Sequence, residues 1–160
     1  MKKKSYALFI LIGTLFVITI PGVTMGFRPF QICLFSEVNA VLTLQGKPVA
    51  GAEIVRTANQ LNSKVYTDKT TTDAQGRFHF AARYIFSLSN FIPAEPVIVQ
   101  RMTIHYQGEK YLGWEGVRSN YGKNNELDGD KPIKLTCELT EEPTLKYQER
   151  RGNIEGICKW

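Results

Sequence analysis

The stretch 46–80 constrains the fold of this chain more than any other part of the sequence, because it contains two β-type runs that each begin at a turn. The first run starts Gly-Lys-Pro-Val-Ala-Gly-Ala, and the second reads Thr-Asp-Ala-Gln-Gly-Arg-Phe-His-Phe. Gly46 and Pro48 favour a turn, because glycine tolerates positive φ and proline cannot donate to a central ladder. Asp73 and Gly76 favour a four-residue hairpin turn. The stretch therefore predicts antiparallel strands joined by tight turns.

Similar β-type segments recur along the rest of the chain. Phe78 and Phe80 alternate with polar residues and are predicted to point into a core. The predicted strands are residues 37–44, 49–57, 64–72, 77–80, 97–106, 110–117 and 132–139. About seven strands at short spacing, with no convincing amphipathic helix after residue 26, are typical of an antiparallel, Ig-like β-sandwich. We therefore predict an all-β domain over residues 33–140, followed by a tail over residues 141–160.

Residues 1–26 have the composition of an export element, with a basic start and a long apolar run that ends at a Pro-Gly pair. Two interpretations remain open. The segment is a signal peptide cleaved after Gly26 or Thr24, or it is an uncleaved anchor, because residues 6–23 are just long enough to span a bilayer. Both place the remaining chain outside the cytoplasm. We therefore predict a periplasmic protein, either secreted or anchored in the inner membrane, with membrane contact through residues 5–23.

The charge pattern and the motifs exclude several classes of function. The formal net charge is +5, of which the lysines at positions 2–4 supply three, so the chain after residue 26 carries +2. Basic and acidic residues are interspersed there, and we expect no nucleic-acid partner. The sequence contains no Gly-x-Ser-x-Gly elbow, phosphate-binding loop or paired metal-ligand motif. We therefore expect neither enzymatic activity nor a cofactor or metal.

Three cysteines matter in an exported chain, because the compartment outside the cytoplasm is oxidising. We favour a disulfide between Cys137 and Cys158, which closes a loop of about 20 residues and staples the tail onto the last strand. The competing pairing is Cys33 with Cys137, which would tie the first strand to the last.

Two sequence segments carry a family resemblance. The motif of residues 46–52, followed by a strand, a loop and the motif of residues 72–80, resembles the carboxypeptidase regulatory-like domain, a transthyretin-like (prealbumin-like) β-sandwich. The longer pattern, from Cys33 through His105 to Cys137, is similar to a family of small bacterial exported proteins with that label. The resemblance implies the fold and a binding or accessory role. In larger proteins such domains accompany a catalytic unit, and no such unit is recognised here.

Two groups of apolar or aromatic residues are candidate binding surfaces. The first lies in the apolar connection 84–93, which is either a plug over one end or face of the sandwich or an exposed patch that docks a partner or touches the membrane. Its residues are Tyr84, Phe86, Leu88 and Phe91. The second group forms either a recognition surface or cross-strand packing. Its residues are Tyr106, Tyr111, Trp114 and Tyr121.

These observations favour a non-enzymatic, extracytoplasmic protein-binding module. Its partner would be a secreted bacterial effector that it neutralises, as immunity proteins do, or another component of the envelope. The alternative is a sandwich that binds carbohydrate or a small ligand through surface aromatics around Trp114.

Overall fold

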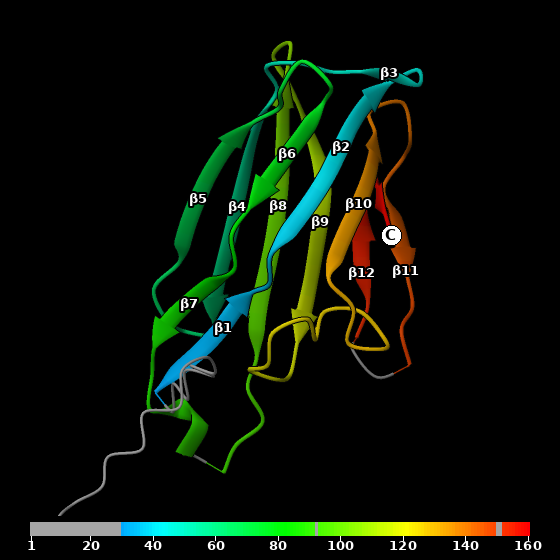
Figure 1. The fold of residues 1–160 in the computed structure, drawn as a ribbon. Helices are drawn as coiled ribbons and strands as arrows, with labels where there is room; N and C mark the ends of the chain where they lie inside the picture. Colours follow the sequence, from blue (N-terminus) through cyan, green and yellow to red (C-terminus); the bar gives the residue numbers. More distant parts are fainter. Residues whose placement is uncertain (1–29, 92, 150–151) are drawn as a thin grey trace, which may run out of the picture.

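The computed structural model describes residues 30–91, 93–149 and 152–160, which form an all-β structure (Figure 1). This confirms the predicted all-β class, whereas the described residues form thirteen strands instead of about seven. The strands are β1 (Gln31–Phe35), β2 (Val38–Leu44), β3 (Lys47–Pro48), β4 (Glu53–Gln60), β5 (Tyr66–Thr71), β6 (Arg77–Phe80), β7 (Arg83–Phe86), β8 (Ile98–Tyr106), β9 (Glu109–Arg118), β10 (Ile133–Glu138), β11 (Thr144–Lys146), β12 (Ile154–Gly156) and β13 (Cys158–Lys159). A short 3₁₀ helix, η1, covers Ser89–Phe91.

The export element predicted over residues 1–26, with its membrane contact through residues 5–23, lies outside the described residues. Within the part of the chain that the structure describes, no helix has both the length and the apolar character needed to cross a membrane.

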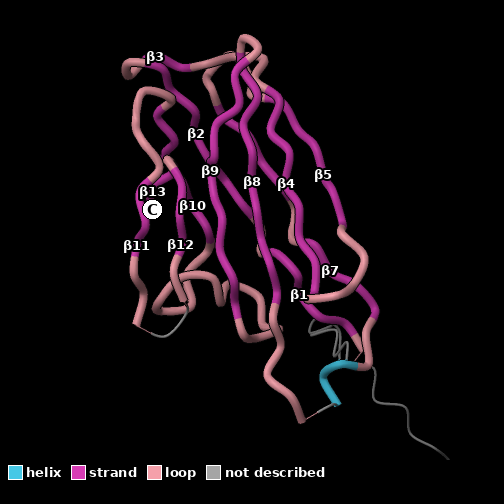
Figure 2. The backbone as a smooth tube through the Cα atoms, turned by 180° about the vertical axis from the view of Figure 1, so that it is seen from behind, coloured by secondary structure: helices cyan, strands magenta, loops and turns pink. Residues whose placement is uncertain are grey.

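Two larger sheets pack face to face, and a two-stranded ribbon of β1 and β7 extends one end of them (Figure 1). One sheet has the order β13-β10-β2-β3, with β6 also paired to β2. The other has the order β11-β12-β9-β8-β4-β5, and its strands lie side by side in Figure 2. The core between the sheets is apolar because alternate residues of each strand point inward. Its buried members include Leu34, Leu42, Ile54, Phe78, Phe80, Ile104 and Trp114.

The second predicted turn forms, but the predicted hairpin is wrong, because the turn links β5 to β6 and these strands belong to different sheets. Asp73 Oδ1 accepts hydrogen bonds from the backbone nitrogens of Gln75 and Arg77, each at 2.9 Å. Gly76 has a φ of 71°, and a Cβ atom there would lie 2.4 Å from the carbonyl oxygen of Leu42. Only glycine fits this position, because the turn presses against the neighbouring strand.

The strand pattern departs from the prediction in three ways. The purely antiparallel arrangement is wrong at one pairing, because β10 runs parallel to β2. The apolar connection contains β7, which pairs with β1. Beyond the predicted attachment to the last strand, where β13 pairs with β10, the tail also contributes β12, which pairs with β9. The tail thus adds strands to both sheets.

The favoured disulfide is confirmed. Cys137 and Cys158 are bonded, and they are direct partners in the register of β10 and β13. Cys33 is buried with a free thiol, so the competing pairing with Cys137 is wrong. Desolvation by burial raises the pKa of that thiol above its ordinary value.

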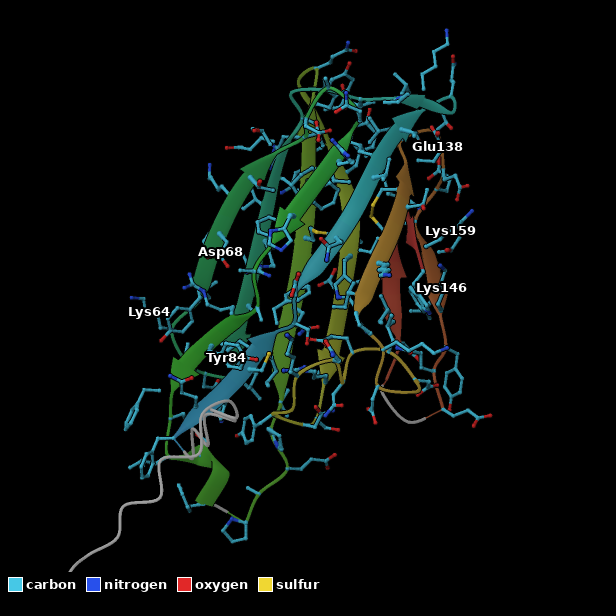
Figure 3. All side chains as sticks on the ribbon, in the orientation of Figure 1. Lys64, Asp68, Tyr84, Glu138, Lys146 and Lys159 are labelled. Carbon is cyan, nitrogen blue, oxygen red and sulfur yellow. A yellow bond between two sulfur atoms is a disulfide. The ribbon has the colours of Figure 1, made fainter. Side chains whose placement is uncertain are left out.

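Glu138 clamps the turn after β2 to the end of β10 (Figure 3). Its carboxylate accepts backbone hydrogen bonds from Gln45 and Gly46 at 2.8 and 2.9 Å, and hydroxyl hydrogen bonds from Thr43 and Thr140, both at 2.8 Å. Desolvation raises the pKa of Glu138, but these donors together outweigh it and lower the pKa from 4.5 to about 2.

We expect Glu138→Gln to lower the free energy of unfolding at neutral pH by about 1 to 2 kcal/mol, because solvent screening at this carboxylate reduces the value implied by the pKa shift. Because the folded-state pKa lies below the unfolded one, this stabilisation is present above pH 4.5 and is lost as the pH falls toward about 2. Urea unfolding across this range measures it. Glu141→Gln is the control, and equal acid sensitivity of the two variants would contradict the assignment.

Candidate binding surface

An exposed apolar patch lies on the β1–β7 ribbon and η1. We define the apolar patch as Phe30, Tyr84, Phe86, Leu88 and Phe91, whose exposed fractions run from 40% for Tyr84 to 72% for Phe86. The Phe30 ring lies 5.8 Å from the Phe86 ring and 5.7 Å from the Phe91 ring, measured between centroids. The structure therefore brings all four predicted residues of the first group to the surface and adds Phe30. This exposure favours a patch over a plug.

Local structure explains why these side chains gather. Along β7, Tyr84 and Phe86 are exposed while the residues between and before them are half-buried, as strand alternation requires. The backbone nitrogen of Ser87 donates to the carbonyl oxygen of Phe30 at 2.8 Å, which extends the pairing of β1 and β7 to these residues. A hydrogen bond from the backbone nitrogen of Phe91 to the carbonyl oxygen of Leu88, at 3.0 Å, closes η1. These hydrogen bonds together place η1 beside Phe30.

An ion-pair triad precedes the patch along β7. Arg56 Nη2 donates to Asp68 Oδ2 at 2.6 Å, and Arg83 Nη2 donates to Asp68 Oδ1, also at 2.6 Å. Figure 3 labels Asp68 on β5 and Tyr84 on β7. The Arg56 guanidinium is buried 4.5 Å from the centroid of the Phe80 ring. Burial lowers the pKa of Arg56, and the hydrogen bond to Asp68 opposes that shift.

Sequence reasoning missed this triad, although one signal was present. Arg56 occupies an inward-facing position of β4, between the buried residues Ile54 and Ala58. A charged side chain at such a position needs an oppositely charged or hydrogen-bonding partner. That partner is Asp68, which stands directly opposite Arg56 in the β4–β5 register.

The second predicted group does not form a surface. Trp114 is 1% exposed and packs between Phe35 and Trp160, with ring centroids at 6.2 and 5.8 Å. Its prediction as a surface aromatic is wrong. Tyr106 and Tyr111 are partly buried against the core and are not register partners. Tyr121 is likewise packed against the core, and its hydroxyl accepts a hydrogen bond from Gln60 at 3.0 Å.

A β-bulge is the physical reason for the burial of Trp114. Leu112 stands opposite Thr103, but Trp114 stands opposite Met102, so Gly113 is an extra residue on β9. A one-residue insertion switches the face to which every later side chain points. The bulge therefore turns Trp114 toward the core.

Among the described residues, no group of three or more His, Cys, Asp and Glu side chains could hold a metal ion. His79 Nε2 lies 3.3 Å from Glu37 Oε1 on the exposed face of β6. The expectation of neither cofactor nor enzymatic activity stays a prediction.

Together, the fold and the patch define a small, sandwich-like all-β domain with an exposed apolar surface at one end. Residues 38–142 match the model of the family described as Domain of unknown function (DUF6795), and the chain belongs to that family. The matched region extends from β2 through β10 and contains every residue of the apolar patch except Phe30. No curated protein and no solved structure matches this chain.

Proposed function

We propose that this chain is a non-enzymatic module that binds another protein outside the cytoplasm through the apolar patch. The observation that supports the proposal is the joint exposure of five large apolar side chains. Single exposed apolar residues are common on soluble proteins, whereas a contiguous group marks an interaction site. Aromatic residues are also enriched at the centres of protein interfaces, where they contribute much of the binding energy.

The proposal includes a transthyretin-like sandwich of the carboxypeptidase regulatory-like kind. The motifs of residues 46–52 and 72–80 support it, and the arrangement of two facing sheets agrees with it. The export element of residues 1–26 supports a periplasmic location. A small exported module of this kind would neutralise a secreted bacterial effector, as immunity proteins do, or serve as an envelope accessory protein. The alternative hypothesis of carbohydrate or small-ligand binding loses support, because Trp114, the residue at the centre of its proposed site, is buried.

The charges around the patch favour a protein over an anionic bilayer as its occupant. Glu95 lines a cavity with Ser89 of η1. A carboxylate at this position would face the negative surface of a bilayer unfavourably. A protein surface can instead place a cationic side chain opposite it.

We expect a photo-crosslinking residue at position 88 to capture one discrete protein in the periplasm of the bacterium that encodes this chain. The captured protein, once purified, is expected to bind the wild-type chain and to bind Phe86→Ser/Phe91→Ser at least about tenfold more weakly, because interface aromatics each contribute 1 kcal/mol or more. Isothermal titration calorimetry measures both affinities. The matched control is Leu145→Ser/Tyr147→Ser, which alters side chains that are 65% and 80% exposed away from the patch.

Three other outcomes would overturn the proposal. Crosslinking to phospholipid would make the patch a membrane-contact surface, and crosslinking to a second copy of the chain would make it a dimer interface. Equal loss of binding in the patch and control variants would show that the patch is not the docking site.

A further inference from the structure

A cavity of about 300 Å³ opens between the edge of β5 and the chain that links β6 to β7. Arg56 and Arg83 line it together with Asp68, Thr70 and His79. The two arginines reach the cavity from different elements, since Arg56 belongs to β4 and Arg83 begins β7. Neither the fold family nor the apolar patch accounts for this concave, charged site.

Charge is unbalanced at the cavity. Asp68 is the carboxylate that pairs with both Arg56 and Arg83, so the three side chains carry one unit of excess positive charge. The other ionisable groups of the cavity wall have partners of their own. Lys69 pairs with Glu53 at 2.9 Å, and His79 lies 3.3 Å from Glu37.

Donors are left over as well as charge. Arg56 Nε and Arg83 Nε are buried and have no hydrogen-bond partner among the described residues. The Arg83 side chain is 34% exposed, whereas the Arg56 side chain is 4% exposed. Arg83 therefore presents the accessible guanidinium, and Arg56 holds Asp68 in place behind it. A guanidinium has five N–H donors in a planar fork, which matches a carboxylate in two parallel hydrogen bonds.

We propose that this cavity is a carboxylate-binding site in which Arg83 donates to the ligand. One carboxylate matches the single excess positive charge of the triad. A phosphate dianion would exceed that charge and would meet repulsion from Asp68, which already occupies the space between the two arginines.

The carboxylate comes either from an acidic side chain of the docked protein or from a free small acid. The first source rests on the proposed function, because Arg83 directly precedes Tyr84 of the apolar patch on β7. The site itself stands without that function, so the two can fail separately.

The test is an NMR titration of the full chain with sodium acetate, at constant ionic strength, followed at the backbone amides and at the arginine Nε–H signals. We expect saturable shifts at Arg83 and its neighbours, and at least about a tenfold loss of affinity in Arg83→Gln. The matched control is Arg77→Gln, which removes another arginine that pairs with one aspartate, Asp73, at 2.9 Å. This control is expected to change acetate affinity less than about twofold. Unchanged thermal melting of Arg83→Gln, in which Asp68 keeps Arg56 as partner, excludes unfolding as the cause.

Equal, non-saturating chemical-shift changes in both variants would overturn the carboxylate site. Tighter binding of inorganic phosphate than of acetate would overturn its selectivity for carboxylates.

The partner captured at position 88 distinguishes the two sources of the carboxylate. If Arg83→Gln weakens that partner's binding about tenfold, the carboxylate belongs to the partner. If partner binding is unchanged while acetate binding is lost, the ligand is a small free acid. Loss of acetate binding in Phe86→Ser/Phe91→Ser would contradict a separate site.

Discussion

Glu126→Gln is expected to lower the free energy of unfolding by about 3 to 5 kcal/mol, because it leaves a buried arginine without its counter-charge. The side chains of Glu126 and Arg118 are 0% and 2% exposed, and Arg118 Nη1 donates to Glu126 Oε1 at 2.8 Å. The same oxygen accepts hydrogen bonds from the backbone nitrogen of Ser36 at 2.8 Å and from Gln100 at 3.1 Å. Urea unfolding, followed by circular dichroism, measures the loss.

The matched control is Glu115→Gln, because Glu115 forms an ion pair with Arg101 on an exposed face of the same sheet at 2.5 Å. An exposed pair contributes about 1 kcal/mol or less. Equal losses in the two variants would contradict the role of burial. Replacing both Arg118 and Glu126 by apolar residues of similar volume is expected to recover much of the loss, because no unpaired charge then remains in the interior.

The Arg118–Glu126 pair also supports the candidate binding surface. Arg118 Nη2 donates to the carbonyl oxygen of Cys33, and the backbone nitrogen of Cys33 donates to the carbonyl oxygen of Tyr121 at 3.1 Å. These hydrogen bonds hold the loop after β9 against β1, and β1 pairs with β7. A variant that breaks the pair is therefore expected to loosen the ribbon that presents Phe86.

The parts of the fold that sequence could predict are those governed by neighbouring residues. Alternation placed Phe78 and Phe80 in the core, and turn chemistry placed Asp73 and Gly76 in a tight turn. Both signals act over a few residues, so they can be recognised without knowing what packs against the strand. The apolar connection was recognisable for the same reason, because a connection rich in large apolar residues is unusual, but the sequence left open whether it is a plug or an exposed patch.

The parts that sequence could not predict depend on residues far apart in the chain. Glu126 contacts Ser36 across a separation of 90 residues, and the Arg83–Asp68 pair joins two different sheets. The polar tail forms β12 only because the edge of β9 is available for pairing. The burial of Trp114 depends on a single bulge residue, which alternation alone cannot reveal.

Replacing Cys137 and Cys158 together by alanine is expected to lower the free energy of unfolding by about 3 kcal/mol, because the bond closes a loop with a sequence separation of 21 residues. The loss is expected to appear first in the tail, where β13 pairs with β10 and Trp160 packs on Trp114. Tryptophan emission then shifts to the red at lower urea concentration than in the wild type.

Reduction of the wild-type chain with dithiothreitol is expected to lower the free energy of unfolding as much as the double substitution does. Dithiothreitol is expected to leave the free energy of unfolding of the double variant unchanged. Cys33→Ala serves as the control, because the buried thiol of Cys33 forms no disulfide. This variant is expected to lose stability on reduction as the wild type does. A double variant with wild-type stability would show that the tail strands hold without the covalent bond. The expected loss would instead mean that the polar tail, which buries only a few large side chains such as Ile154 and Ile157, needs the disulfide to stay paired with both sheets.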